Sequence, residues 1–496
     1  MSTQTDESQV KKMESEIAQF FSGRKVLITV GLGCLGKLLI EKLLRCCPNI
    51  ATLYVFVREK DGKNPRERIQ QLPELPLFEK LKEEQPHFLQ KLIMIESDLS
   101  KPNLGLSQQN RNRLLDTNVI FHGAMMTRLN QKFRIMVNVN VQATKDILLL
   151  ARNMPDLKAF VHLSTTFAHS PIKSIEEKHY PPPIKTDELL SLLNILNDRK
   201  LDALTSSLID GWPNSFTFTK AVAEDTVLRY GNGMPVCIVR PSNVTSTWNE
   251  PIMCWSDSVY GPIGLLVSSS LGLLRTIRSH VKKNLDFVPA DYVTSCLIAT
   301  AWHINARHTK GEFKVNAETG VVSVAERVLV YNYVSSCQKP MTWDTFKKHV
   351  RTHGSNIPGV EKMRLRYIVW NSRLWVHKIF MFLMHLLSAT IVDDSASLLS
   401  GYPPRWYRAY NLISTYFVAM YHSISQQWYF RNDAVVELWG RMNAVDREIF
   451  KFDMSNFDWS EYVKRMTYNM RDFVNNDSLD GVKERVTDYI ELRFYT

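Results

Sequence analysis

Three glycines near the amino terminus have the spacing of a loop that binds a pyrophosphate. Gly31, Gly33 and Gly36 follow the pattern G-x-G-x-x-G. They lie between the apolar run 25–29, typical of a buried parallel strand, and 37–45, where leucines recur at helical spacing. Glycines in this position let backbone N–H groups approach a pyrophosphate, and the helix N-terminus adds a favourable dipole. We predict a nucleotide site here, with an ordinary strand-to-helix turn as the alternative.

Charged residues after the next two predicted strands bear on the choice of cofactor. Arg58 follows the strand 52–57, whose end meets the adenosine ribose in a dinucleotide fold. An acidic residue there would bind the 2′-hydroxyl of NAD, whereas a basic residue suits the 2′-phosphate of NADP. Arg58 therefore favours NADP(H), with a solvated loop arginine as the alternative. Asp98 follows the strand 92–95, where its carboxylate could accept a hydrogen bond from the adenine amino group.

Hydroxyl side chains gather after another predicted strand, 158–164. Ser164, Thr165 and Thr166 are consecutive at the carboxyl end of that strand. This end of a parallel strand is where doubly wound sheets place their chemistry. The hydroxyls are therefore candidates for the reacting centre, with ordinary capping of the strand end as the alternative.

The elements that must position these residues alternate between strands and helices, which predicts an α/β fold with a doubly wound parallel sheet. The predicted strands are 25–29, 52–57, 92–95, 119–123, 158–164 and 235–240. The predicted helices are 37–45, 139–152 and 215–229, with a helix-forming connection at 65–85 and an insertion at 180–208 that continues as a helix.

The second half of the chain has a different character. The apolar stretch 375–392 is interrupted by His385 and is shorter than the roughly 20 residues that span a bilayer. We predict a buried or interfacial helix there, and further helices over 426–473. Aromatic residues gather over 406–421, which suits a core or a membrane interface. The earlier segment 261–278 could wall an acyl pocket or form a core helix.

Composition and charge exclude some partners. The 496 residues are enough for two or three domains, and they carry a formal net charge of +11. The basic residues are scattered, so nucleic acid is a poor candidate, whereas an anionic cofactor, an anionic substrate or a membrane surface fits. The seven cysteines form no C-x-x-C pair, which predicts a reduced intracellular compartment. We predict no metal site, and the polar amino terminus lacks the apolar core of a signal peptide.

Most of the chain resembles the fatty acyl-CoA reductases. The resemblance rests on stretches spread along the whole chain, a set far more specific than a glycine motif alone. They are KVLIT…LGKLLIEKLLR, SDLSKPNLGLS, VIFHGA, FVHLST, FTFTKAVAE, PVCIVRPSNVTSTWNEP, GPIGLL, VPADYV and WYFRNDAVVELWGRMNAVDREIFKFDMSNFDWSEYV.

The resemblance implies an extended short-chain dehydrogenase fold followed by a helical carboxyl-terminal domain. We predict a reductase domain over 21–355 and the helical domain over 356–475, flanked by a polar segment 1–20 and a tail 476–496. The family reduces long-chain fatty acyl-CoA to a primary alcohol and free CoA, and consumes two NADPH. Because it works at peroxisomal or endoplasmic reticulum membranes, we expect a membrane surface as a partner, with a homodimer as a possible assembly.

The resemblance also implies catalytic residues. Lys220 matches the lysine that holds the nicotinamide ribose and lowers the pKa of a tyrosine four residues earlier. Thr165, with Ser164 beside it, matches the hydroxyl that helps to bind the substrate oxygen. The tyrosine position is Phe216, which can neither donate a proton nor bind an oxyanion. Losing a positioned general acid costs on the order of 10²–10⁴ in rate, and Thr217, Thr219 or a lysine-bound water could substitute weakly.

The nucleotide loop departs from the family pattern as well. Val30 replaces a glycine and Leu32 replaces a threonine, and valine tolerates a positive φ poorly. Gly31 could compensate, because it restores the glycine pattern one residue later. Phe167 stands where the family usually has tyrosine. The predicted cofactor-binding residues are Thr29, Gly31, Gly33, Leu35, Gly36, Arg58, Asp98, Leu99, Ala124, Asn140, Lys220, Pro241 and Val244.

Two functions follow from these patterns. The first is an NADPH-dependent fatty acyl-CoA reductase that forms an alcohol. The second is a catalytically impaired member of the family that binds acyl-CoA or a nucleotide and acts as a regulatory protein. Sterol or sugar-nucleotide redox chemistry fits the amino-terminal half alone, but the carboxyl-terminal domain argues against it.

Overall fold

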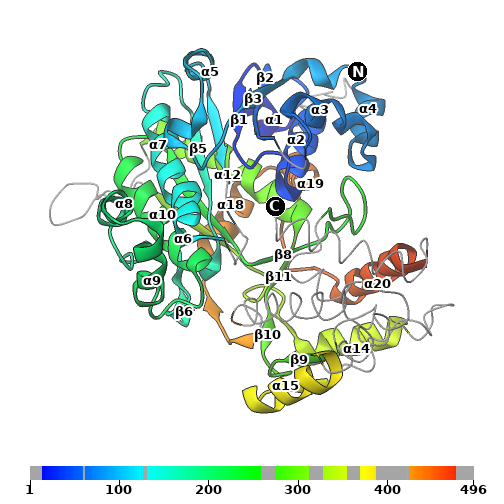
Figure 1. The fold of residues 1–496 in the computed structure, drawn as a ribbon. Coiled ribbons are helices and arrows are strands. Elements are labelled where there is room, and N and C mark those ends of the chain that lie inside the picture. Colours follow the sequence, from blue (N-terminus) through cyan, green and yellow to red (C-terminus); the bar gives the residue numbers. More distant parts are fainter. Residues whose placement is uncertain are drawn as a thin grey trace, which may run out of the picture.

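The computed structural model describes residues 14–59, 62–123, 126, 131–257, 275–311, 328–354, 369–386, 422 and 425–475. Within them, seven parallel strands form one central sheet in the order β12-β7-β5-β4-β1-β2-β3 (Figure 1). The strands are β1 (Lys25–Ile28), β2 (Thr52–Val57), β3 (Leu92–Glu96), β4 (Val119–His122), β5 (Ala159–Leu163), β7 (Val236–Pro241) and β12 (Leu329–Tyr333). The strand order reverses between β1 and β4, and ligands bind at such a switch point, outside the carboxyl ends of the strands. The predicted doubly wound α/β sheet is confirmed.

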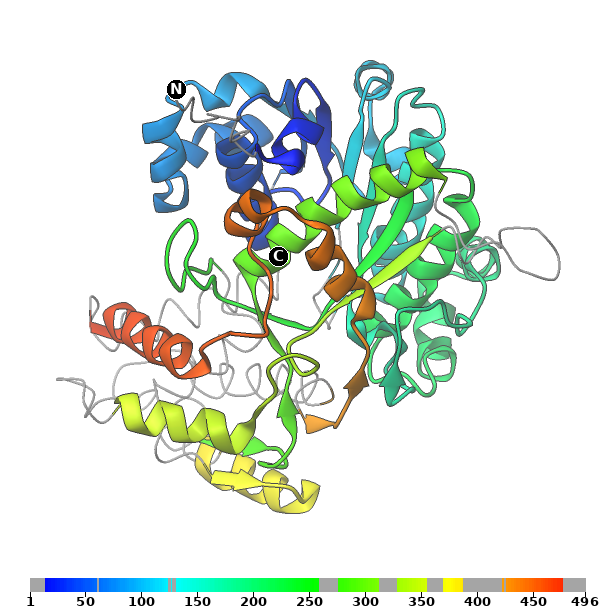
Figure 2. The same cartoon turned by 180° about the vertical axis from the view of Figure 1, so that it is seen from behind.

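One face of the sheet is covered by α2 (Cys34–Cys46) and α12 (Ala290–Lys310). Alternate side chains of a strand point to opposite faces, so Val26 and Ile28 of β1 join this core. They pack in the same cluster as Leu297 of α12. Figure 2 shows α12 running across this face. Because α12 packs against α2, it holds the helix that follows the glycine turn in place beside the sheet.

The opposite face is covered by α7 (Ala143–Ala151) and α10 (Ser215–Tyr230). Leu27 of β1 points to this side and belongs to a second core cluster with Ile147 of α7 and Val227 of α10. Both faces are therefore apolar, which explains why the strands are nearly continuous hydrophobic runs.

A smaller lobe lies away from the central sheet (Figure 1). In it, β9 (Thr276–Arg278) pairs with β14 (Val369–Asn371), and α14 (Trp343–Gly354) packs against α20 (Trp459–Asn475). The helix α15 (Leu374–Met381) lies at the outer edge of this lobe. In the part of the chain that the structure describes, no helix combines the length and the apolar character needed to cross a bilayer.

The carboxyl-terminal segment returns from this lobe to the central sheet. β15 (Tyr429–Phe430) pairs with β6 (Ser174–Ile175), and α18 (Asp433–Arg441) packs beside α12 (Figure 2). The next helix, α19 (Ala444–Ile449), holds the amino-terminal α1 (Glu16–Phe21), because Asp446 accepts a hydrogen bond from Ser15 Oγ at 2.6 Å. The amino-terminal helix is thus tied to the carboxyl-terminal segment.

The remaining elements are short. The helices and helical turns are α3 (Pro65–Gln70), η1 (Leu72–Glu74), η2 (Pro76–Phe78), α4 (Glu79–Glu84), η3 (Phe88–Lys91), η4 (Pro102–Gly105), α5 (Gln108–Leu114), α6 (Phe133–Val137), η5 (Asn138–Gln142), η6 (Thr166–His169), α8 (Thr186–Ile195), α9 (Asp198–Leu208) and η9 (Phe382–Leu386). The strands β8 (Asn243–Thr245) and β11 (Phe287–Pro289) pair with each other, as do β10 (Asn284–Leu285) and β13 (Met341–Thr342).

Several predicted elements differ in detail. The predicted helix 139–152 begins as the π-helical turn η5, and the single helix predicted within 180–208 is two, because Asn197 caps a second one. Residues 276–278 form a strand rather than the end of a helix. The predictions for 261–274, 387–392 and 406–421 lie outside the described residues.

Candidate active site

The glycine turn between β1 and α2 has the shape that a pyrophosphate needs. Gly31 adopts a φ of +66°, a left-handed conformation that favours glycine. A β-carbon on Gly36 would lie 1.9 Å from the Gly31 carbonyl oxygen, so the turn closes on the helix too tightly for a side chain. Gly33 precedes the first helical residue, and no side chain caps this end of α2. The first-turn N–H groups can therefore bond to a phosphate, which fits a dinucleotide.

Val30 and Leu32, the two departures in this loop, are accommodated without a left-handed backbone. In the described chain, the residues other than glycine with a positive φ lie elsewhere, and the positive φ of this turn falls on Gly31. Val30 packs over Gly123 at the end of β4, where a β-carbon would lie 2.6 Å from Val30 Cγ2. Both side chains also contact the core beside the sheet. The loop therefore keeps its fold because Gly31, one residue after Val30, adopts the left-handed conformation.

The amine of Lys220 reaches the carboxyl end of β5 from α10. Its Nζ donates a hydrogen bond to the Leu163 carbonyl oxygen at 2.8 Å and lies 3.3 Å from His162 Nε2. The side chain is buried. Burial lowers the pKa of the amine to about 8, although the Glu224 carboxylate opposes this change. The lysine is therefore charged at neutral pH, and the residue that accepts its hydrogen bond, Leu163, precedes Thr165 by two residues.

Two histidines on neighbouring strands surround this amine. His122 of β4 and His162 of β5 have ring centroids 5.4 Å apart. Burial and, next, the charge of Lys220 lower the pKa of His122 to about 3 and that of His162 well below its usual value. Both rings are therefore neutral near pH 7. His122 Nδ1 lies 2.9 Å from Thr29 Oγ1, which links the surroundings of the lysine to the start of the glycine turn.

Phe216 lies one helical turn before Lys220 and is half-buried. Its ring carries no proton to donate. The hydroxyls of Thr217 and Thr219, which the sequence offered as substitute donors, already donate to helix carbonyl oxygens at 3.1 and 2.7 Å. These two threonines are therefore held by their own helix, and a water bound by the lysine is the remaining substitute.

The two hydroxyls at the end of β5 have different partners. Ser164 Oγ donates to Glu224 Oε1 at 2.5 Å, whereas Thr165 Oγ1 accepts a hydrogen bond from Phe167 N at 3.3 Å. A hydroxyl that acts as an acceptor keeps its proton for donation. Thr165 is thus the hydroxyl that can bond to a substrate oxygen, and Ser164 is committed to the protein.

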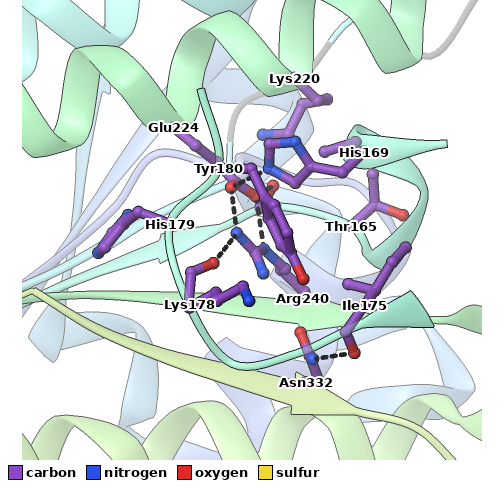
Figure 3. A network of polar contacts seen from close by, with 12 residues as sticks. Thr165, His169, Ile175, Lys178, His179, Tyr180, Lys220, Glu224, Arg240 and Asn332 are labelled. Atoms are coloured by element: carbon purple, nitrogen blue, oxygen red, sulfur yellow. Dashed lines mark hydrogen bonds and ion pairs between the residues drawn. The ribbon is translucent and has the colours of Figure 1, made fainter. Parts of the chain in front are cut away.

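A buried cluster beside Lys220 escaped the sequence reasoning (Figure 3). Glu224, one turn after Lys220 in α10, forms an ion pair with Arg240 of β7 at 2.6 Å, and His169 Nε2 lies 2.8 Å from the same carboxylate. The sequence did contain a sign of this cluster. Arg240 is a charged residue at the end of an apolar strand, and Glu224 lies on the same helix face as Lys220. What the sequence could not show is that the three elements meet.

The predicted cofactor residues are spread along the carboxyl edge of the sheet. Thr29 and the glycine turn follow β1, Leu35 lies in the first turn of α2, Arg58 follows β2, Asp98 and Leu99 follow β3, Pro241 ends β7 and Val244 lies in β8. Ala124 lies outside the described residues. Their common edge is where a dinucleotide binds in such a fold. Their contacts with a cofactor stay a prediction.

Some of these side chains already have protein partners. Asn140 Oδ1 accepts from Met126 N at 2.8 Å, and Asn140 Nδ2 donates to Thr219 Oγ1 at 2.9 Å. Asp98 accepts hydrogen bonds from Ser100 N and Oγ at 3.0 and 2.6 Å, so its carboxylate also shapes its own loop. The Arg58 side chain, by contrast, is exposed. Within the described residues, no cluster of three or more histidine, cysteine or carboxylate side chains could hold a metal ion.

Comparison with known protein families agrees with this geometry. Residues 28–297 match the NAD_binding_4 family and residues 384–477 match the Sterile family, each described as male sterility protein. Among solved structures, the terminal R domain of the myxalamid PKS-NRPS pathway has a TM-score of 0.55 at 17% identity, covering 94% of this chain and 97% of that one. A reductase domain of a nonribosomal peptide synthetase from Mycobacterium tuberculosis has a TM-score of 0.55 at 16% identity, covering 95% and 96%. These structures share the fold.

Curated relatives are similar over almost the whole chain. Fatty acyl-CoA reductase 1 of Homo sapiens is 32% identical over 467 residues, which covers 94% of this chain and 87% of that protein. Fatty acyl-CoA reductase wat of Drosophila melanogaster is 32% identical over 489 residues, which covers 97% and 90%. With the glycine turn, the buried lysine and the strand-end hydroxyl in one sheet edge, the chain belongs to the fatty acyl-CoA reductase family.

Proposed function

We propose that this chain reduces long-chain fatty acyl-CoA to a primary alcohol and free CoA, consuming two NADPH and two protons. The observation that carries the proposal is the amine of Lys220, held 2.8 Å from the Leu163 carbonyl oxygen at the carboxyl end of β5. This position lies at the same sheet edge as the glycine turn and next to Thr165. A dinucleotide on that turn and a thioester carbonyl near the threonine would therefore meet beside the lysine.

Different residues of the chain would bind the substrate oxygen and the cofactor. A bound NADPH would supply the hydride. Thr165 would donate a hydrogen bond to the carbonyl oxygen, where negative charge develops, and Lys220 would hold the nicotinamide ribose through its ammonium protons. Phe216 contributes neither a proton nor a hydrogen bond, so we assign the proton to a water bound by Lys220. We therefore expect turnover to be slow.

Arg58 supports NADPH as the preferred cofactor. Its side chain is exposed after β2, where a dinucleotide fold places the adenosine ribose, and a guanidinium can bind a phosphate through two hydrogen bonds. Replacing Arg58 by alanine should weaken NADPH binding and leave NADH binding unchanged. Fluorescence titration with both cofactors measures this difference, and equal losses for the two would contradict the preference.

The test of the function is direct. Purified protein is incubated with palmitoyl-CoA and NADPH, and hexadecanol is quantified by gas chromatography together with the thiol of released CoA. We expect slow alcohol formation that Lys220→Ala abolishes. Aldehyde without alcohol would limit the proposal to the first reduction. A chain that binds no NADPH in a fluorescence titration is not a reductase.

A catalytically impaired member of the family is the second candidate, and Phe216 is the observation that favours it. Such a protein would bind NADPH or acyl-CoA through the same sheet edge without forming product. The two candidates separate when binding and turnover are measured on one preparation. Binding with no product, and product after Phe216→Tyr, identifies the impaired member.

We further propose that the outer helix α15 and the turn η9 that follows it contact a membrane surface, at the peroxisome or the endoplasmic reticulum. Trp375 of α15 is 61% exposed, and Phe382 and Leu383 of the adjoining turn η9 are 55% and 49% exposed, while Arg373 and Lys378 lie near Trp375 in the sequence. Exposed aromatic and aliphatic side chains flanked by basic residues suit an interface with anionic lipids. The paired substitution of Trp375 and Phe382 by serine should reduce flotation with anionic vesicles. Equal flotation of the unaltered and the substituted protein would exclude α15 and η9 as the contact.

A further inference from the structure

Both carboxylate oxygens of Glu224 are hydrogen-bonded to other residues of the protein (Figure 3). Arg240 Nε donates to Oε1 at 2.9 Å and Arg240 Nη2 donates to Oε2 at 2.6 Å. Ser164 Oγ donates to Oε1 at 2.5 Å, and His169 Nε2 lies 2.8 Å from Oε2. Glu224 is 3% exposed and Arg240 is fully buried. A carboxylate that is both buried and fully bonded holds its surroundings in one geometry.

The partners of Glu224 come from separate elements that converge on the site. Ser164 follows β5 and directly precedes Thr165, His169 lies in η6, and Arg240 lies in β7. Arg240 also donates to the carbonyl oxygens of Glu176 and Lys178 at 3.2 and 3.0 Å. The cluster thus joins α10, two strand ends and one loop. It fixes the turn of α10 that carries Lys220 against the strand that carries Thr165.

Among the titratable groups around Lys220, Glu224 is the one that raises the pKa of the lysine amine. The titratable groups on the surrounding elements are His122 (β4), His162 (β5), His169 (η6), His179 and Tyr180 (loop after β6), Glu224 (α10) and Arg240 (β7). His122 and His162 are neutral near pH 7 because burial and the lysine charge lower their pKa values. The Glu224 carboxylate acts in the opposite direction, since it raises the pKa of the lysine.

Glu224 itself stays ionised in this environment. Burial disfavours its charge, but the Arg240 guanidinium and His169 hold the pKa of the carboxyl well below its usual range. One helical turn separates it from Lys220, so the two side chains share a face of α10. The lysine therefore has a permanent negative charge on its own helix.

We propose that Glu224 is a positioning residue for cofactor binding: its carboxylate fixes the Lys220 turn of α10 against β5 and β7 and places a negative charge one helical turn from the lysine amine. This inference rests on the proposed function, because it assigns the charged amine to the dinucleotide. An ammonium group offers three hydrogen-bond donors to the ribose and attracts an anionic cofactor, whereas a neutral amine does neither as well. Glu224 would thus set the pH range in which the site binds NADPH.

The test is the affinity for NADPH as a function of pH. In the unaltered chain, affinity should fall as pH rises through the pKa of the Lys220 amine, about 8. In Glu224→Gln the carboxylate charge is lost, so the amine loses its proton at a lower pH. We expect the midpoint of the fall to move down by about one unit or more, the usual size of the effect of a nearby opposite charge. Fluorescence titration between pH 6 and 9.5 measures it.

Two further variants separate charge from general damage. Glu41→Gln is the matched control, because Glu41 is also buried in a helix and pairs with an arginine, Arg45, at 2.5 Å. Its midpoint should stay where it is in the unaltered chain. Glu224→Asp keeps the charge and should keep the midpoint near 8 while weakening affinity at every pH, because the shorter side chain strains the cluster. This variant carries the test if Glu224→Gln does not fold.

The outcomes decide the inference without ambiguity. A lowered midpoint in Glu224→Gln alone supports it. An unshifted midpoint in folded Glu224→Gln, or an equal shift in Glu41→Gln, overturns it while the proposed function stands. A midpoint in Glu224→Asp that is lowered as far as the midpoint expected for Glu224→Gln also overturns the inference, because the aspartate keeps the negative charge. No NADPH binding by the unaltered chain at any pH overturns both.

Discussion

Two turns of this molecule depart from the pattern of its family, and the fold treats them differently. In the glycine turn, Val30 and Leu32 change the loop, yet Gly31 takes up the left-handed φ and Gly36 still closes onto it. In the first turn of α10, Phe216 stands where the resemblance to the family predicts a tyrosine. The first change alters shape, which a neighbouring glycine restores, whereas the second removes a proton donor.

The surroundings of Phe216 explain why packing does not restore that donor. The threonine hydroxyls beside it in α10 donate to helix carbonyl oxygens, and Ser164 donates to Glu224. Thr165 can bond to an oxyanion, but an aliphatic hydroxyl is a far weaker acid than a phenol beside an ammonium group. A fold can thus supply a missing backbone conformation from a neighbour more easily than a missing functional group.

Restoring the tyrosine should have the largest effect. Phe216→Tyr places a phenol one helical turn before Lys220, whose charge favours the ionised phenol. We expect alcohol formation from palmitoyl-CoA to rise by on the order of 10²-fold or more, as for the gain of a positioned general acid. Product is measured by gas chromatography at saturating NADPH.

Phe218→Tyr is the matched control for this change. Phe218 lies two residues further along α10 but is fully buried, with its ring centroid 5.9 Å from that of Phe133. A hydroxyl there enters an apolar cluster, so activity should not rise and stability should fall by about 1–3 kcal/mol. If both variants, or neither, raised activity, the tyrosine position would not explain slow turnover.

The sequence predicted the sheet better than it predicted the cluster around the lysine. Strand 52–57 is found at its predicted bounds, because a strand buried on both faces is a continuous apolar run whatever lies beside it. The Glu224–Arg240 pair joins a helix and a strand through tertiary packing, and no local pattern encodes which charges will meet. The π-helical turn η5, which carries Asn140, was missed for a related reason. Asn140 of this turn bonds to Met126 N and Thr219 Oγ1, and helix periodicity does not encode such contacts.

Closing the glycine turn should weaken cofactor binding by a smaller but clear factor. In Gly36→Ala, the new β-carbon would lie 1.9 Å from the Gly31 carbonyl oxygen, so the turn must move away from the helix. We expect the Kd for NADPH to rise about tenfold or more, equivalent to about 1.4 kcal/mol. Gly440→Ala in α18 is the control, since a β-carbon there meets nothing within 4 Å. An unchanged Kd in Gly36→Ala would remove this turn from the cofactor site.

Returning the valine to the family's glycine should have the smallest effect, and this contrast is the sharpest test of the comparison. In Val30→Gly the new glycine would add no conformation that the loop lacks, because Gly31 already supplies the positive φ. We expect the Kd for NADPH to change by less than about threefold, and thermal stability to fall, since Val30 packs over Gly123 and the core. Fluorescence titration and thermal unfolding measure the two effects on one sample. A large gain in affinity would show that Val30 obstructs the phosphate, and the glycine turn would then be as impaired as the tyrosine position.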